Sequence, residues 1–218
     1  MLPTRSSIIE YVHELRQMGL ATISFFYFYF RDGGKQDVRH LLTSILIQLC
    51  NQSDKYSEIL SALYTDHGHG SYQPSEDALM ECSKKMLELP GQGALYVIID
   101  ALDESPNSSG LTSSRGEVLT TVQKLVELSL PHVHFCITSQ PEIDIWDVLE
   151  PLATHSFPIQ NQVGQRQDII DYITSVVSSH REMRRWRDED KMLVIDTLME
   201  RAGGMYVLTR YTVLLAQI

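Results

Sequence analysis

The sequence has few cysteines and no long apolar run. Its three cysteines, Cys50, Cys82 and Cys136, are odd in number, widely spaced and form no C-x-x-C pair. This pattern argues against a disulfide framework or a zinc site, and it predicts a reducing, cytoplasmic location. No apolar run is longer than that of residues 25–30, which is far short of the roughly 18 residues of a membrane span. We therefore expect neither a membrane anchor nor a signal peptide.

Basic residues are also scarce. Lys and Arg number 18 against 28 Asp and Glu, which gives a net charge of −10 and a pI near 5.2. A chain with this charge repels the polyanionic backbone of DNA and RNA, so nucleic acid is disfavoured as a partner. Hydrophobic residues make up 43% of the 218 positions, which is enough for one globular core.

A short apolar run that ends in carboxylates stands out in the middle of the chain. Residues 95–99 are Leu-Tyr-Val-Ile-Ile, which is typical of a strand covered on both faces in a parallel sheet. Asp100, Asp103 and Glu104 follow, at the end where open α/β sheets keep their ligand crevices. A carboxylate there can hold Mg²⁺, and a neighbouring acid can orient an attacking water beside a nucleotide γ-phosphate. The alternative interpretation is a strand end with solvated acids.

Strands and helices alternate along most of the chain. Strands are expected at residues 21–30, 95–100, 132–139 and, more weakly, 154–159, and helices are expected to begin at Ser7, Val38, Ser75 and Ser114. After residue 166 the apolar spacing indicates helices alone. We therefore predict an α/β fold, a three-layer parallel sheet between helices. Residues 1–162 are expected to form its core, and residues 163–218 a helical extension.

Two pairs of histidines are candidate metal ligands. His67 and His69 flank Gly68 in a polar loop, but no nearby Cys or third His completes a tetrahedral set. His132 and His134 alternate on an expected strand, at its entry end and away from the predicted crevice. Ordinary loop, surface or packing histidines are the favoured interpretation of both pairs.

A set of motifs is spread over residues 7–206. They are Phe-Phe-Tyr-Phe-Tyr-Phe-Arg-Asp at 25–32, Leu-Pro-Gly-Gln-Gly at 89–93, Asp-Ala-Leu-Asp-Glu at 100–104, the strand at 134–139 followed by Pro141 and Glu142, Arg-Arg-Trp-Arg-Asp-Glu-Asp-Lys at 184–191, and Glu-Arg-Ala-Gly-Gly-Met at 200–205. Together they resemble the NACHT family of signalling NTPases. More narrowly, the chain is similar to the fungal NACHT proteins whose domain is grouped with the nephrocystin-3-like N-terminal region.

The resemblance implies a P-loop NTPase-like fold of the STAND class. In such a fold Asp100 holds Mg²⁺, and Asp103 or Glu104 orients the water that attacks bound ATP or GTP. The phosphate-cradling motif G-x-x-x-x-G-K-[ST] of this fold is absent from the sequence. Gln140 stands where the resemblance implies an arginine that senses the γ-phosphate, and glutamine cannot supply the charge.

The implied function is a nucleotide-dependent switch that drives oligomerisation of a larger signalling protein in an innate-immunity-like role. Because the P-loop and its strand are missing, we expect this copy to be fragmentary and weak or inactive in nucleotide binding. We also expect a gap in the sheet between the strand at Phe135 and the one near Phe157. One alternative is a non-catalytic interaction module that self-associates or binds other NACHT proteins. Another is an unrelated Mg²⁺-dependent enzyme that uses Asp100 and Asp103.

Overall fold

The computed structural model describes residues 7–91, 93–107, 114–158, 171, 174–179, 183, 186–197 and 212–216. The chain forms two compact units, of which the first takes residues 1–157 and 212–218 and the second residues 158–211. The predicted boundary between residues 162 and 163 lies outside the described residues. In the second unit, residues 174–179 and 188–197 are helical, as the apolar spacing predicts. No helix among the described residues is long and apolar enough to cross a membrane.

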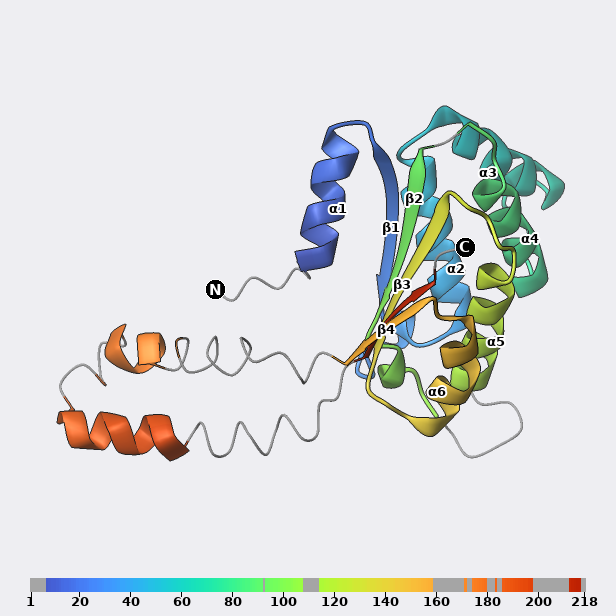
Figure 1. Cartoon of the computed structure of the whole chain (residues 1–218). Coiled ribbons are helices and arrows are strands. Elements are labelled where there is room, and N and C mark those ends of the chain that lie inside the picture. Colours follow the sequence, from blue (N-terminus) through green and yellow to red (C-terminus); the bar gives the residue numbers. More distant parts are fainter. Residues whose placement is uncertain are drawn as a thin grey trace. The chain divides into compact units, whose positions relative to one another are not determined.

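The first unit is built on a sheet with the strand order β1-β2-β3-β5-β4 (Figure 1). The strands are β1 (Ala21–Tyr27), β2 (Ala94–Asp100), β3 (Val133–Ser139), β4 (His155–Pro158) and β5 (Thr212–Ala216). β1, β2 and β3 are parallel neighbours, so their carboxyl ends lie at the same edge of the sheet. The predicted α/β architecture with a parallel sheet is thus confirmed, and the apolar run at residues 95–99 is the middle strand of the parallel part.

β5 occupies the place for which the sequence predicts a gap. It pairs antiparallel with β3, from Phe135 opposite Ala216 to Ser139 opposite Thr212, and β4 lies on its other side. The expectation of helices alone after residue 166 is therefore wrong for residues 212–216. The physical reason is that the buried N–H and C=O groups of β3 need partners on both sides. The segment Thr-Val-Leu-Leu-Ala, which begins with two β-branched residues, supplies them.

Helices cover both faces of the sheet. α1 (Ser7–Gln17) packs beside β1 on one face, and α2 (Val38–Cys50), α4 (Glu76–Leu87) and α5 (Ser114–Val126) cover the other face (Figure 1). α3 (Asp54–Asp66) packs on α2 and α4, and α6 (Ile143–Leu149) packs on α5. Short 3₁₀ helices lie at Gly33–Lys35 (η1), Leu102–Glu104 (η2) and Glu150–Leu152 (η3).

The main hydrophobic core lies between the sheet and the layer of α2, α4 and α5. Leu42 and Leu49 of α2 are fully buried there, together with Val97 and Ile99 of β2. Ile98 is buried as well, but the alternation of side chains along a strand directs it to the opposite face. β2 is thus apolar on both sides, which explains why its residues form a continuous apolar run.

Two serines lie at the starts of helices that the sequence predicts. Ser75 is the N-cap of α4, because its hydroxyl accepts the Ala78 N–H at 3.2 Å. Ser114, which was expected to cap α5, is its first described residue, and its hydroxyl donates to the Gln36 carbonyl at 2.9 Å. The start of α5 is therefore fastened to the loop after β1.

Candidate functional site

The three predicted acids lie on a tight turn at the carboxyl end of β2. Asp100 is the last residue of the strand, Ala101 adopts a left-handed conformation with φ 53° and ψ 48°, and Asp103 and Glu104 belong to η2. The left-handed conformation costs a residue other than glycine about 1–2 kcal/mol. The Ala101 N–H donates to Thr138 Oγ1 at 2.9 Å, which offsets part of this cost. Residue 138 of β3 thus helps to hold the turn.

Two of the acids accept hydrogen bonds from the end of β3. The Thr138 hydroxyl donates to Asp100 Oδ1, and the Gln140 N–H donates to Asp103 Oδ1 at 3.0 Å. The structure therefore places Asp103 beside Gln140, the predicted sensor position. The contact is made by the Gln140 backbone N–H. Their assigned roles in catalysis and sensing stay predictions.

The third acid connects the turn to β1. The Phe30 N–H, in the loop after β1, donates to Glu104 Oε2 at 3.2 Å. The Phe28 N–H donates to the Asp100 carbonyl at 3.0 Å, which continues the pairing of the two strands. The acids of the predicted site thus join the ends of β1, β2 and β3.

Arg115, in the first turn of α5, completes this site, and the sequence analysis does not identify it. Its side chain, which is 7% exposed, donates from Nε to the Ser105 carbonyl at 3.1 Å and from Nη2 to the Asp103 carbonyl. Its Nη1 lies 3.5 Å from Asp144 Oδ2 and 3.8 Å from Glu142 Oε2. Arg115 therefore fastens the turn after β2 to the loop after β3. The place of Arg115 in the sequence is a signal for this structural role. The helix dipole disfavours a cation in the first turn, so an arginine there is expected to have another partner.

Cys136 lies beside the site in the core. Burial, and then the nearby charge of Asp100, raise the pKa of the Cys136 thiol to about 11. Burial is also the main reason why the pKa of Cys82 is raised to about 11. Both thiols are free and buried, so their environment disfavours the reactive thiolate.

Asp100 is the predicted Mg²⁺-binding acid of the site, and one alternative interpretation also uses Asp103. Mg²⁺ is usually bound in proteins by one or two carboxylates, together with waters and the phosphates of a substrate. Within the described ranges, no group of three or more His, Cys, Asp or Glu side chains is placed to hold a metal ion. Asp100 and Asp103 each also have a carboxylate oxygen engaged by a donor from β3 or its following residue. The structure gives both carboxylates a structural use as acceptors, and their role in metal binding stays a prediction.

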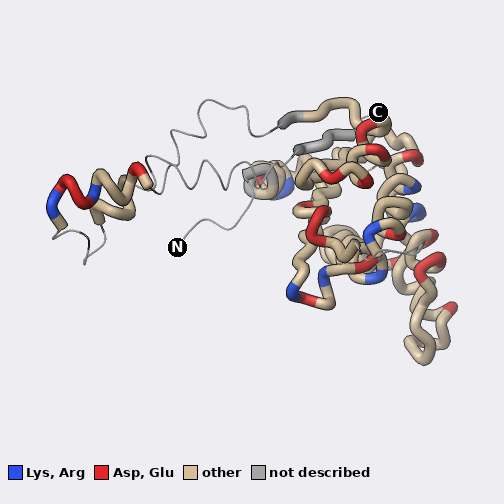
Figure 2. The backbone as a smooth tube through the Cα atoms, turned by 90° about the horizontal axis from the view of Figure 1, so that it is seen from below, with Lys and Arg blue, Asp and Glu red and all other residues tan. Residues whose placement is uncertain are grey.

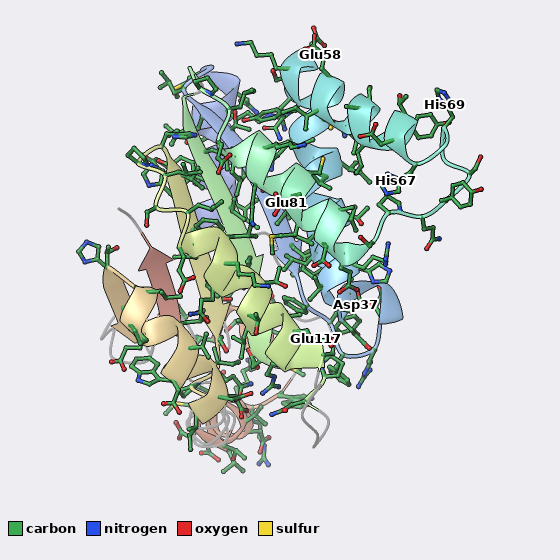
Figure 3. The ribbon with its side chains drawn as sticks, turned by 90° about the vertical axis from the view of Figure 1, so that its right-hand side faces the viewer. Asp37, Glu58, His67, His69, Glu81 and Glu117 are labelled. Carbon is green, nitrogen blue, oxygen red and sulfur yellow. The ribbon has the colours of Figure 1, made fainter. Side chains whose placement is uncertain are left out.

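The loop histidines have other partners. His67 and His69 lie in the turn after α3 (Figure 3), where His67 Nδ1 is 2.8 Å from the Leu63 carbonyl oxygen. The His69 ring meets the Tyr64 ring edge-on, with centroids 5.8 Å apart. These contacts suit ordinary loop histidines.

The strand histidines are part of the sheet packing. His132 Nε2 lies 2.9 Å from the Leu87 carbonyl oxygen. The His134 ring lies 5.0 Å from the ring of Tyr96, its neighbour on β2. Burial, and then the nearby His132, lower the pKa of His134. Both histidines precede or begin β3 and are thus far along the strand from the acids.

Comparison with known proteins identifies one family. The family model described as "Nephrocystin 3, N-terminal" matches residues 4–140, which is more than half of the chain. The chain belongs to the nephrocystin 3 N-terminal family. The match contains β1, β2 and β3 of this nephrocystin 3 N-terminal domain, the turn with the three acids, and Arg115. No curated protein and no solved structure matches the chain.

Proposed function

We propose that this nephrocystin 3 N-terminal domain is a NACHT-type nucleotide-switch domain whose own nucleotide binding is weak or absent. In this proposal it is a cytoplasmic, regulatory part of a larger signalling protein, with partners that include copies of itself or other NACHT proteins. The observation that carries the proposal is the turn after β2. There Asp100 and Asp103 lie at the edge where open parallel sheets usually keep their ligand sites, and both accept hydrogen bonds from the end of β3.

Two features support the switch-type origin of the domain. The first is the set of three parallel strands with acids at the carboxyl end of the middle one, which suits a P-loop NTPase-like fold. The second is the direct link from Asp103 to Gln140, the position at which the resemblance implies a γ-phosphate sensor. A hydrogen bond of this kind can couple the ends of β2 and β3, so that a displacement of one strand end also displaces the other.

Three features support weak nucleotide binding. The sequence contains no G-x-x-x-x-G-K-[ST], whose N–H groups and lysine normally supply most of a triphosphate site. Gln140 carries no charge with which to hold a γ-phosphate. The Thr138 hydroxyl donates to Asp100 Oδ1, so one oxygen of this carboxylate already serves as an acceptor within the protein.

Calorimetric titration of the full chain with Mg-ATP and Mg-GTP tests the proposal. The expected result is no saturable heat of binding up to about 1 mM nucleotide. A Kd of about 1 mM corresponds to a binding free energy of only about 4 kcal/mol. Asp100→Asn and the control Asp188→Asn, whose side chain is 97% exposed, should give the same flat titrations. Micromolar binding that Asp100→Asn abolishes and Asp188→Asn leaves intact would contradict the proposal.

A second candidate function is a non-catalytic interaction module derived from a NACHT domain. The observation that favours it is a large apolar groove on the first unit, whose lining does not include Asp100, Asp103 or Glu104. For the third candidate, a Mg²⁺-dependent enzyme that uses Asp100 and Asp103, metal-dependent turnover without a nucleotide would be the distinguishing observation.

A further inference from the structure

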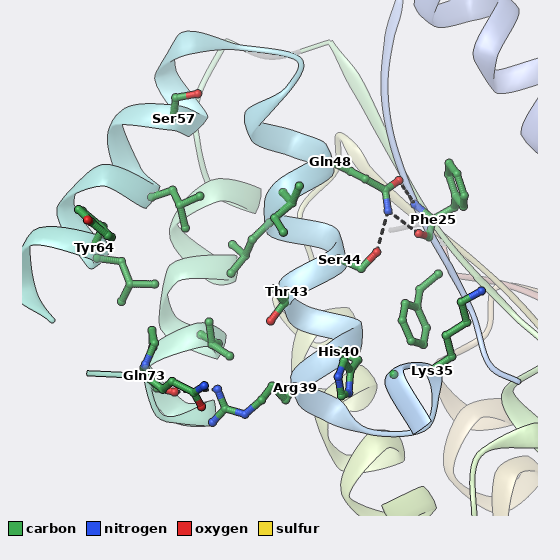
Figure 4. Close-up of a pocket in the computed structure, with 18 of the residues that line it drawn as sticks. Phe25, Lys35, Arg39, His40, Thr43, Ser44, Gln48, Ser57, Tyr64 and Gln73 are labelled. Carbon is green, nitrogen blue, oxygen red and sulfur yellow. Dashed lines mark hydrogen bonds between the residues drawn. The ribbon is translucent and has the colours of Figure 1, made fainter. Parts of the chain in front are cut away.

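A groove of about 1080 Å³ lies along the outer side of α2. Its walls come from the edge strand β1, from α2 and α3, and from residues 73 and 74 (Figure 4). All of these segments belong to the first unit. The volume is slightly above the usual range of about 300–1,000 Å³ for small-molecule sites, which favours a larger occupant.

The mouth of the groove is apolar and exposed. Tyr27, Ile47 and Tyr64 are 45%, 51% and 54% exposed, and each of them lines it. Ile47 and Tyr64 come from α2 and α3, whereas the Tyr27 ring lies on the face of β1 opposite Phe26, with Lys35 Nζ 4.1 Å from its centroid. Exposed apolar side chains that line one groove are typical of an interaction site.

The edge of β1 beside the groove already has hydrogen-bond partners, which disfavours the addition of a strand. The free edge of β1 borders the groove, and such an edge ordinarily invites a further strand. Here the Gln48 amide pairs with the Phe25 N–H and C=O, and the Gln52 amide pairs in the same way with Ile23. Strand addition would have to break all four bonds. A groove between two helices instead suits a helix, which brings its own backbone hydrogen bonds.

The groove also has a charge preference. No Asp or Glu is among the residues that line it, whereas Lys35, Arg39 and His40 are, in a chain whose net charge is −10. Figure 2 shows how Lys and Arg, and Asp and Glu, are distributed along the backbone. Lys35 lies 3.8 Å from the Asp32 carboxylate and His40 lies 2.7 Å from that of Asp37, so these two have acidic neighbours.

Arg39 is different. Its guanidinium donates to the Pro74 carbonyl at 2.9 Å, and it forms no ion pair within the described part of the chain. It lies in the first turn of α2, where the positive end of the helix dipole adds to its charge. Figure 4 shows Arg39 and His40 at the end of the groove opposite Ser57. The groove is therefore apolar along its length and cationic at one end.

We propose that this groove binds an amphipathic α-helix of a partner protein. The apolar stripe of that helix lies against Ile47, Leu60 and Tyr64, and a carboxylate at one of its ends pairs with Arg39. α2 has 13 residues and is therefore about 20 Å long, so it accommodates a partner helix of three to four turns. This inference goes beyond the proposed switch function and needs no nucleotide.

The test is a selection of peptides on the folded full-length chain. A display library of helical 16-residue peptides is selected for binding to the wild type, and peptides that also bind Ile47→Asp are removed. The remaining peptides are synthesised, and their affinities for the chain are measured by fluorescence anisotropy. We expect enriched peptides to carry apolar residues at i, i+3, i+4 and i+7 and a Glu or Asp in a terminal turn. Ile47→Asp and Arg39→Glu should each weaken binding at least tenfold. Because Ile47 and Arg39 are not fully buried, both variants should fold, which a thermal melt checks.

Two controls and a charge swap sharpen the result. Met18→Asp replaces an exposed apolar residue, and Arg187→Glu an exposed cation, that do not line the groove; both should bind like the wild type. Exchanging the peptide's carboxylate for arginine should restore binding to Arg39→Glu. The proposal is overturned if no peptide binds the wild type better than it binds Ile47→Asp, or if the enriched peptides lack the acidic residue or form strands. It is equally overturned if the arginine-bearing peptide does not regain affinity for Arg39→Glu. It is also overturned if Ile47→Asp abolishes a dimer of the wild-type chain, because the occupant is then a second copy.

Discussion

The Gln48 amide pairs with the backbone of Phe25 as a neighbouring strand would. The Phe25 N–H donates to Gln48 Oε1 at 3.0 Å, and Gln48 Nε2 donates to the Phe25 carbonyl at 2.7 Å (Figure 4). Four residues later, in the turn that follows α2, Gln52 repeats the arrangement with Ile23, at 3.1 and 2.7 Å. Residues 23 and 25 of β1 direct their N–H and C=O groups to the same side, and Gln52 Nε2 also donates to the Gln48 carbonyl at 2.6 Å. The spacing of the two glutamines therefore matches the spacing of the open edge.

Replacing these glutamines should open the edge of β1. Gln48→Leu removes both bonds to Phe25 and the bond to Ser44, and we expect the free energy of unfolding to fall by about 1–2 kcal/mol. The double variant Gln48→Leu, Gln52→Leu should also self-associate, because it exposes unpaired strand groups. Urea unfolding and light scattering measure the two effects.

The matched control is Gln123→Leu on α5. Gln123 is half-buried and its amide donates to the Glu127 side chain in an exposed hydrogen bond, so its loss should change stability by less than about 0.5 kcal/mol. Monomeric behaviour of the double variant at high concentration would show that the glutamines do not guard the edge.

Arg115→Met should destabilise the first unit by about 2–3 kcal/mol. The substitution keeps much of the side-chain volume but leaves the Ser105 and Asp103 carbonyls without their donor in a buried place. It also removes the cation beside Asp144, although that carboxylate is 41% exposed and regains water. Denaturant unfolding is the measurement.

Arg187→Met is the comparison for Arg115. The Arg187 side chain is 81% exposed and pairs with Asp190 at 3.2 Å, so its loss should cost less than about 0.5 kcal/mol. A cost below about 1 kcal/mol for Arg115→Met would mean that the turn after β2 does not depend on the guanidinium.

The sequence was a good guide where local chemistry decides the structure. The apolar run at residues 95–99 predicted a doubly covered strand, and β2 is one. Ser75 before two acids predicted a helix start, and Ser75 caps α4. In both cases the physical cause of the local structure lies in a few adjacent residues.

The sequence was a poor guide where the partner lies far along the chain. The acids were recognised as a group, but their donors Thr138 and Gln140 lie more than thirty residues away, and no local pattern links them. Gln48 resembles any polar residue on a helix until its distance to Phe25 is known. β5 was missed for the same reason, because its strand state depends on the open side of β3.

Thr138→Val tests the structural role of the Asp100 carboxylate. The valine keeps the shape of threonine but removes the donor to Asp100 and the acceptor of the Ala101 N–H, so we expect a loss of about 1–3 kcal/mol. Thr65→Val is the control, because the Thr65 hydroxyl only donates to the Ser61 carbonyl on an exposed helix surface. Equal stabilities of the two variants in urea would indicate that the Thr138 hydroxyl contributes nothing to the turn.

The last prediction concerns the acid side of the pH–stability curve. His134 has a pKa below the ordinary value of 6.5, because burial and then the nearby His132 disfavour its charged form. As pH falls through 6.5, the unfolded chain takes up a proton at this residue before the folded chain does, and the free energy of unfolding decreases. His134→Phe keeps a ring against Tyr96 but cannot be protonated, so its stability should fall less steeply between about pH 7 and 5. Tyr96→Phe retains the histidine and should keep the wild-type slope; parallel curves for the wild type and His134→Phe in urea unfolding at several pH values would rule out this contribution.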